Sequence, residues 1–232
     1  MKIWTTIIGC TCCLALLANG RGESNIDQGL VDLVQAIDHK AETISTIKAD
    51  FHQVRDITLM TEPMEIRGTF FLKKPDGLKF YAVPEDDLIV VITEKEVVSL
   101  NPKAKKAARV ELKKRRDFLT QNILTKRLEA MLGYFTITKS SNADSDGNHY
   151  LMLTPIKRKF KKKFKKIHLW VNSDYIIFKV HVEEKDGDVY KLELTNIQVN
   201  VPIDSSEFST SIPSDYEMGD RMSFILGSDL GF

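Results

Sequence analysis

The sequence predicts a mainly β protein with few helices, in which about ten or eleven antiparallel strands form one curved sheet or open barrel. Three observations support this prediction. Apolar and polar residues alternate with period two in many short segments between residues 47 and 201, as in strands with one buried face. Pro, Gly, Asn and Asp residues separate these segments, as in hairpin turns. Helical periodicity is confined to two places, so the helices are expected to cover the sheet as a lid.

The longer helical segment lies near the N-terminus. Its apolar residues recur at helical spacing on one face: Leu30, Leu33, Val34, Ile37, Ala41 and Ile44. A second, shorter amphipathic helix is indicated by Leu124, Leu128, Met131 and Leu132. Gly133 follows it at a position typical of a helix C-terminus. The apolar faces of both helices need a large apolar surface elsewhere in the chain.

The predicted strands follow one another with short connections. The turn Lys74-Pro75-Asp76-Gly77 reverses the chain between two of them and predicts a hairpin. The strands are expected at residues 47–54, 66–73, 78–82, 88–93, 96–101, 106–111, 135–139, 149–154, 167–172, 176–184 and 189–201.

Several of these strands carry apolar residues on both faces, such as Phe70 with Phe71 and Phe80 with Tyr81. One interpretation is a sandwich-like core with tight packing on both faces. The other is a cavity lined by one face of the sheet and suited to an apolar ligand. A curved sheet of this size is not expected to fill its hollow side with its own side chains, which favours the helices as a cover.

The first twenty residues have the features of a cleaved secretory signal peptide. They contain Lys2, an apolar run over residues 7–18 and no acidic residue, with small residues Ala18 and Gly20 before the expected cleavage site. A retained membrane anchor is one alternative, and a lipidated Cys10 after a lipobox-like sequence is another. Residues 21–216 are expected to form a single domain, followed by a C-terminal tail over 217–232.

Composition and motifs argue against several classes of function. The 33 basic and 32 acidic residues balance, so a generally basic nucleic-acid binder is not indicated. All three cysteines lie in the signal segment, which excludes disulfides and thiol chemistry from the secreted chain. No nucleotide-binding or hydrolase motif occurs. The five histidines lack metal-ligand spacing, although His168 and His181 could face each other on neighbouring strands. We therefore expect no enzyme activity, no cofactor and no metal.

One short segment is strongly basic. Residues 157–166 contain eight cations and no acidic residue, and Ile156, Phe160 and Phe164 would form one stripe if the segment were helical. Such a segment could dock to an acidic partner, lie on anionic lipid or bind phosphates. The alternative is a solvated surface turn with both Phe rings packed into the sheet. The residues expected to dock to a partner or membrane are Lys157, Arg158, Phe160, Lys161, Lys162, Phe164 and Lys165.

The order of several short motifs resembles that of the bacterial periplasmic lipoprotein carrier family (LolA-like). Ile47-Lys48-Ala49-Asp50-Phe51-His52-Gln53 resembles its first strand, with the pattern x-A-x-F-x-Q. Gly68-Thr69-Phe70-Phe71-Leu72-Lys73-Lys74-Pro75 resembles its G-x-L-x-x-K-R-P hairpin. Leu153-Thr154-Pro155 and the segment from Phe208 to Tyr216 resemble two later motifs. The motifs are short, but they occur in the same order over about 170 residues.

The resemblance implies an incomplete antiparallel barrel with a helical lid over a cavity that binds lipoprotein acyl chains. It also implies a monomeric periplasmic carrier that takes its cargo from an inner-membrane ABC-type release complex and delivers it to an outer-membrane acceptor, without nucleic acid. The family's lid-latching arginine falls on Lys74, which lacks the planar fork of arginine. The apolar residue associated with partner docking falls on Leu78.

The cavity is expected to be lined by one face of the first strands and by the two helices. The predicted lining residues are Leu33, Ile37, Ile47, Ala49, Phe51, Phe70, Leu72, Phe80, Ala82, Leu124 and Leu128. Two alternatives to lipoprotein transport stay open: an envelope-stress sensor or regulator of the same fold, and a carrier of a free lipid or glycolipid.

Overall fold

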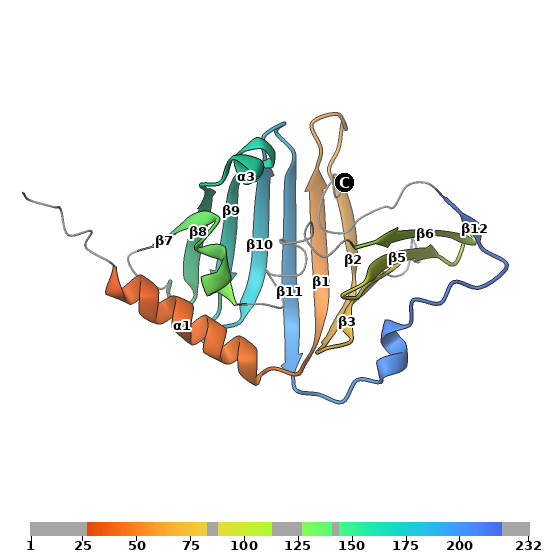
Figure 1. Cartoon of the computed structure of the whole chain (residues 1–232), viewed down its shortest axis with the longest axis horizontal. Helices are drawn as coiled ribbons and strands as arrows, with labels where there is room; N and C mark the ends of the chain where they lie inside the picture. Colours follow the sequence, from red (N-terminus) through yellow and green to blue (C-terminus); the bar gives the residue numbers. More distant parts are fainter. Residues whose placement is uncertain (1–26, 83–87, 113–126, 141–143, 220–232) are drawn as a thin grey trace, which may run out of the picture.

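A computed structural model describes residues 27–82, 88–112, 127–140 and 144–219. These residues form one open sheet of twelve strands, in the order β12-β6-β5-β4-β3-β2-β1-β11-β10-β9-β8-β7. Every neighbouring pair is antiparallel except β12 with β6. The sheet is unclosed and strongly bent, with helix α1 across the ends of strands β7 to β10 (Figure 1). The prediction of an incomplete antiparallel barrel with a helix is confirmed.

Few helical elements interrupt the succession of strands. The helical elements are α1 (Gln28–Thr43), η1 (Leu128–Met131), α3 (Arg158–Lys163) and η2 (Ser205–Phe208). The strands are β1 (Thr46–Asp56), β2 (Met64–Lys73), β3 (Gly77–Ala82), β4 (Ile89–Ile92), β5 (Glu96–Asn101), β6 (Lys106–Glu111), β7 (Phe135–Lys139), β8 (His149–Pro155), β9 (Phe164–Val171), β10 (Ile177–Glu184), β11 (Val189–Val199) and β12 (Glu217–Met218).

All eleven predicted strands are present, and β12 is the additional one. Its two residues belong to the segment expected to be a tail, and they pair in parallel with β6. The second predicted helix is a single 3₁₀ turn, η1, within the described residues. Leu124, the signal segment and residues 220–232 lie outside the described residues. Residues 157–166 are not one helix, because α3 ends at Lys163 and β9 begins at Phe164.

Helix α1 begins at a clear capping signal and buries the predicted face. The Asp27 carboxylate accepts a hydrogen bond from the Leu30 N–H, which satisfies one of the free amides of the first turn. Leu33, Val34 and Ile37 are buried against the sheet. This packing covers the apolar stripe of the helix, which an isolated amphipathic helix would leave in water.

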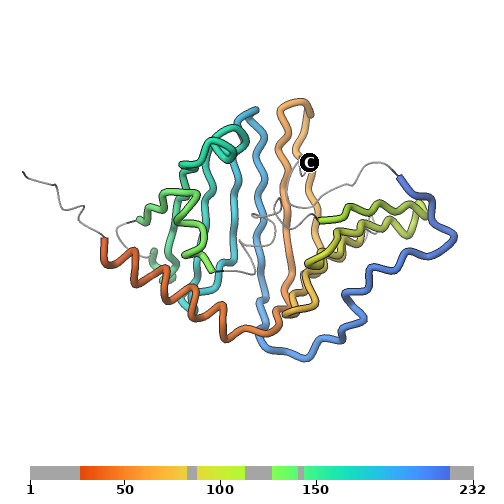
Figure 2. The backbone as a smooth tube through the Cα atoms, in the orientation of Figure 1, coloured from red at the N-terminus to blue at the C-terminus, as the bar shows by residue number. Residues whose placement is uncertain are grey.

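The bend of the sheet is visible where β5 and β6 run nearly across the direction of β1 and β11 (Figure 2). Gly68 on β2 allows a close approach of β3 in this region. A Cβ atom built on Gly68 would lie 2.0 Å from the Tyr81 carbonyl oxygen. A side chain at this position would force the two strands apart, so the glycine is a requirement of the local geometry.

Two hydrophobic clusters pack on the sheet. The first contains residues of β1 to β5 and β11, among them Phe51, Phe70 and Phe80, whose rings contact one another at centroid distances of 5.3 and 5.0 Å. The second contains residues of α1, η1 and β7 to β10, among them Ile37 and Leu128. Within the described residues, no helix is both long enough and apolar enough to cross a membrane.

Candidate functional site

A small apolar cavity lies beneath the C-terminal half of α1. The residues that line it come from both hydrophobic clusters, so the cavity marks the junction between them. From the first cluster come Ile44, Ile47, Phe70, Leu72, Ile176 and Leu194. The second cluster contributes Ile37 and Leu128, and Ile177 is a partly buried residue packed against it. Asp38, Ala41, Lys74 and Tyr175 complete the lining.

The cavity has a volume of about 50 Å³. An engineered protein cavity of roughly 150 Å³ binds benzene, so this one is too small for an acyl chain. The side chains of the two clusters pack around this cavity. The expected acyl-chain site stays a prediction, and the cavity that the described residues line is smaller than such a site requires. An acyl chain would enter only if α1 or the side chains beneath it moved.

Lys74 connects the hairpin after β2 to the C-terminal end of α1. Its Nζ donates a hydrogen bond of 2.5 Å to the Ala41 carbonyl, one of the last carbonyls of the helix, which lack partners inside it. The backbone N–H of Lys74 also donates to the Ser45 carbonyl. Burial lowers the pKa of Lys74, while the nearby Glu42 carboxylate opposes this shift. The single ammonium group thus does part of what a guanidinium fork could do at several carbonyls.

Asp38 connects the middle of α1 to η1. Its carboxylate accepts hydrogen bonds from the backbone N–H groups of Leu128 at 2.5 Å and Glu129 at 2.9 Å. Burial raises the pKa of Asp38, and the bonds from the Glu129 and Leu128 amides act against that rise. Arg127, just before η1, adds an exposed ion pair with Glu42 on α1. These contacts and that of Lys74 fix the helix over the cavity.

The structure brings together six of the residues expected at the site: Ile37, Ile47, Phe70, Leu72, Lys74 and Leu128. Four others, Ala49, Phe51, Phe80 and Ala82, are buried in the first cluster on the same face of the sheet but do not line the cavity. Leu33 is buried in the second cluster.

Sequence reasoning missed Asp38, Ala41 and Ile44 and the contributions of β10 and β11. The sequence could have indicated Asp38 as a buried residue, because it follows Ile37 on the apolar face of the helix. A carboxylate at such a position is buried and needs donors. Tyr175, Ile176 and Leu194 had no such signal, since their place at the cavity depends on the long-range pairing of the sheet.

The residues expected to dock a partner through apolar contacts are buried. Leu78 is 2% exposed and belongs to the first cluster. Phe160 and Phe164 belong to the second cluster, and the Phe160 ring packs on Phe135 and Tyr134 at centroid distances of 5.3 and 5.4 Å. The structure therefore places both Phe rings in the core, as in the alternative interpretation of the basic segment. None of the three side chains offers an exposed docking surface here.

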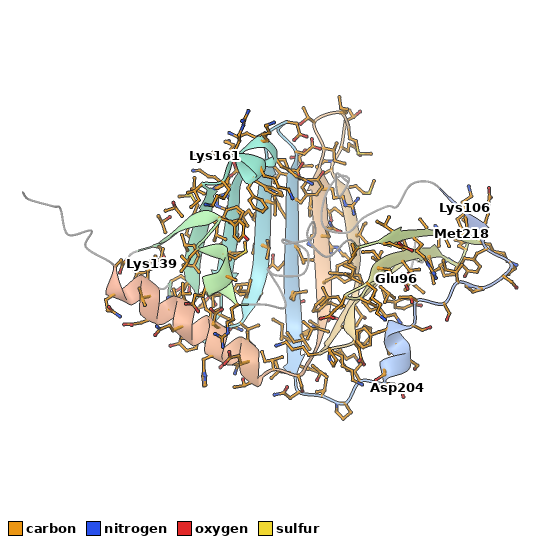
Figure 3. All side chains as sticks on the ribbon, viewed as in Figure 1. Glu96, Lys106, Lys139, Lys161, Asp204 and Met218 are labelled. Carbon is orange, nitrogen blue, oxygen red and sulfur yellow. The ribbon has the colours of Figure 1, made fainter. Side chains whose placement is uncertain are left out.

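The cations of the basic segment are nevertheless exposed. We call this surface the basic edge; its exposed cations are Lys157, Arg158, Lys159, Lys161, Lys162 and Lys165. Figure 3 labels Lys161 at this end of the sheet, opposite Lys106 at the far side of the molecule. In the described part of the chain, only Lys163 and Lys165 of residues 157–166 have acidic partners, Glu184 and Glu183.

Exposed apolar side chains border the basic edge. Leu132, Tyr134 and Ile156 are 46%, 36% and 44% exposed. They lie close together, because the Ile156 N–H donates a 2.8 Å hydrogen bond to the Tyr134 carbonyl. Helix α3 begins directly after this contact. The edge therefore presents apolar and cationic groups side by side.

A polar aromatic cluster covers the other face of β8, β9 and β10. His168 and His181 face each other across β9 and β10 as predicted. The Tyr150 hydroxyl lies 2.6 Å from His168 Nδ1, and His168 Nε2 lies 2.8 Å from the Glu183 carboxylate. Trp170 packs on His181 with ring centroids 4.4 Å apart. No group of side chains suited to a metal ion occurs among the described residues.

Comparison with known proteins agrees with the fold. The family described as "Outer membrane lipoprotein carrier protein LolA" matches residues 42–211, which is most of the chain. The chain belongs to the LolA family. The matched range includes every strand from β1 to β11 and the whole first cluster, while the α1 residues of the second cluster precede it.

Solved structures with low sequence identity are similar to this LolA-family chain. An uncharacterized conserved protein from Thermus thermophilus has 11% identity and a TM-score of 0.51, with 84% of this chain and 100% of that chain covered. The lipoprotein LppX from Mycobacterium tuberculosis has 8% identity and a TM-score of 0.50, with 77% and 99% covered. A LolA superfamily protein from Nitrosomonas europaea has 15% identity and a TM-score of 0.39, with 75% and 96% covered. No curated protein matches the chain.

Proposed function

We propose that this LolA-family protein binds the acyl chains of lipoproteins between the two hydrophobic clusters and carries them through the periplasm from the inner to the outer membrane. The observation that carries the proposal is the apolar cavity at the cluster junction, covered by a helix that few polar contacts hold. Each methylene group removed from water contributes about 0.8 kcal/mol. A multiply acylated protein therefore needs such shelter to cross an aqueous compartment.

A small cavity beneath a helix is compatible with carriage. A cover that both opens for cargo and closes without it gives two states of similar free energy, and cargo shifts the balance between them. Loading would come from an inner-membrane ABC-type release complex and unloading from an outer-membrane acceptor. The protein would act as a monomer and perform no chemistry on the cargo.

The basic edge is proposed as the surface that meets anionic lipid. Lys and Arg near an anionic membrane contribute about 1 kcal/mol each, and adjacent apolar groups can enter the interface. A surface with both features suits a carrier that exchanges cargo at membranes. This replaces the docking role expected for Phe160 and Phe164, which are buried.

Native mass spectrometry of the protein purified from its own cell envelope tests the main proposal. We expect a bound acylated polypeptide. A free lipid or glycolipid would instead make the protein a lipid carrier, and recovery of the empty protein after crosslinking to a signalling partner would favour a sensor. Ala41→Phe, which fills the cavity, should abolish recovery of cargo. Gln35→Phe, an exposed substitution on the same helix, is the matched control and should retain it.

Vesicle cosedimentation tests the basic edge. Lys161→Glu with Lys162→Glu should weaken binding to phosphatidylglycerol-containing vesicles by at least about tenfold at low salt. Lys95→Glu with Lys106→Glu makes the same change in net charge at exposed positions elsewhere and should have little effect. Equal losses in both double variants would show that only net charge matters and would remove the edge as a docking surface.

A further inference from the structure

Two polar side chains on the buried face of β1 carry atoms without a hydrogen-bond partner among the described residues. Gln53 is fully buried, and neither its Oε1 nor its Nε2 has one. Arg55 is 8% exposed, and its Nε and Nη2 also have none. Nearly all buried polar side chains in native proteins are hydrogen-bonded, so each exception needs an explanation. Two such residues at neighbouring positions on one face indicate a site.

These side chains lie on the apolar face that leads to the cavity. The alternation of β1 buries Ile47, Ala49, Phe51, Gln53 and Arg55 together. Gln53 pairs across the sheet with Ile66 on β2 and Leu192 on β11, both buried apolar residues. Ile47 lines the cavity, and Arg55 lies eight residues further along, about 26 Å at 3.3 Å per residue. One face thus has an apolar hollow at one end and unpaired donors at the other.

The charge of Arg55 has no counter-charge among the described residues. Its cross-strand partner on β11 is Tyr190. The nearby hairpin acid, Asp188, accepts hydrogen bonds from the Thr58 N–H at 2.9 Å and from the Tyr190 hydroxyl at 3.4 Å. Burial lowers the pKa of Arg55, yet a guanidinium keeps its proton in proteins. A buried, uncompensated cation is costly, and an anionic ligand would offset that cost.

We propose that Arg55 and Gln53 form a subsite for the anionic head of an amphiphile, a carboxylate or a phosphate monoester. The acyl chain of this amphiphile would lie along β1 toward the cavity. Nε and Nη2 of Arg55 provide the planar pair of donors that a carboxylate or phosphate accepts, and Gln53 Nε2 provides a further donor. This inference goes beyond the proposed function, because acyl chains joined to a lipoprotein carry no free carboxylate or phosphate; it assigns to the same face a second ligand, a free anionic amphiphile.

Isothermal titration calorimetry with three probes tests the subsite: dodecanoate, methyl dodecanoate and inorganic phosphate. We expect the wild-type protein to bind dodecanoate at least about tenfold more tightly than the uncharged ester, as a charge-assisted bidentate contact would give. Arg55→Met should reduce this preference to about twofold or less and leave the affinity for the ester unchanged. Gln53→Met should reduce it partly. Arg67→Met, on the exposed face of β2, is the control and should keep the full preference.

The possible failures are distinguishable. Equal affinity of the wild-type protein for the acid and its ester, or a preference that survives Arg55→Met, would overturn the subsite and leave acyl binding intact. Binding of inorganic phosphate as tight as that of dodecanoate would overturn it in favour of a free-anion site. Absence of binding to both dodecyl probes would also overturn the subsite, whereas the lipoprotein proposal is tested separately by native mass spectrometry.

A stability measurement without ligand tests whether Arg55 recognises a head group or serves only the packing of the protein. Thermal unfolding of Arg55→Met should show a midpoint equal to or above that of the wild type, since the variant removes an unpaired buried charge. A lower midpoint together with an unchanged preference for the acid would mean that the guanidinium serves packing alone, and would overturn the proposal.

Discussion

Lys74 Nζ donates a 2.5 Å hydrogen bond to the carbonyl of Ala41, and both residues line the apolar cavity. The contact joins the hairpin after β2 to the last turn of the helix that covers the junction between the two clusters. Together with the contacts of Asp38 and Arg127, it holds the helix over the cavity. Changes at Lys74 should therefore alter the opening of the helix more than the stability of the sheet.

Lys74→Met should reduce the protection of the C-terminal turn of α1 against amide hydrogen exchange. The variant keeps the apolar stem and removes one hydrogen bond from a charged donor, worth about 1.5–3 kcal/mol. Exchange in β1 and β11 should stay as in the wild type. Lys48→Met, at an exposed position of β1, is the control. Unchanged exchange in α1 would show that the contact does not hold the helix.

Lys74→Arg should have the opposite effect. A guanidinium presents five donors in a planar fork that can reach several carbonyls at the helix end, whereas the ammonium of Lys74 bonds the carbonyl of Ala41. Slower exchange in α1 and slower release of a bound fluorescent fatty acid are the expected results. Faster release in this variant would contradict a latch at position 74.

Asp38→Ala should lower the free energy of unfolding by about 1–3 kcal/mol. The substitution leaves the Leu128 and Glu129 amides without their acceptor in a partly buried place, and an unsatisfied buried donor costs that much. Urea denaturation measures the change. Asp32→Ala, on the exposed side of α1, should change stability by less than about 0.5 kcal/mol. Equal effects of the two variants would contradict the role of Asp38 in joining α1 to η1.

Phe160→Ala should destabilise the protein by about 3–5 kcal/mol, the range for removal of a buried aromatic ring. The ring packs on Phe135 and Tyr134 in the second cluster. Lys161→Ala changes the next, exposed residue and should leave the urea midpoint nearly unchanged. A stable Phe160→Ala variant that had lost vesicle binding would instead return this ring to the docking surface.

His181 should make the protein less stable as the pH falls from about 6.5 to 4. Burial beside Trp170 and the positive charges of Lys179 and Lys191 lower the pKa of His181 to about 4. In this window the unfolded chain binds a proton that the folded protein does not, so the free energy of unfolding decreases and the loss is complete below pH 4. The effect is on the order of 1 kcal/mol for a ring that solvent partly screens.

His181→Gln should remove this part of the pH dependence. Unfolding free energies measured by urea titration at pH 7 and pH 4.5 should differ less in the variant than in the wild type. His39→Gln, an exposed substitution on α1, is the control. An identical pH dependence in the His181 variant and the wild type would contradict the assignment.

The strands could be predicted from the sequence because most of them bury one face and expose the other. β1 alternates cleanly from Ile47 to Arg55, and the hairpin at residues 74–77 was marked by its turn residues. β12 could not be predicted in this way. Its two residues, Glu217 and Met218, have no period, and their place depends on the edge of β6 to which they add.

The site was only partly predictable, for two physical reasons. Residues of α1 and β1 could be assigned to it because each lies on an evident apolar face. Leu194 reaches the cavity through its pairing with β1, and Ile176 through its place just before β10, and a single sequence reveals neither. The basic segment shows the second reason: the spacing of Phe160 and Phe164 fits a helix, but β9 begins at Phe164 and both rings pack inward.

The separation of the apolar interior into two clusters along one sheet has a mechanical consequence. Each cluster rests on its own group of strands, and the boundary between the two groups lies between β11 and β10. A hydrocarbon chain that entered at this boundary would increase the angle between the two halves of the sheet, while each half kept its own packing. The sheet would bend at the boundary between the two halves. A larger ligand would need a wider angle between them rather than partial unfolding.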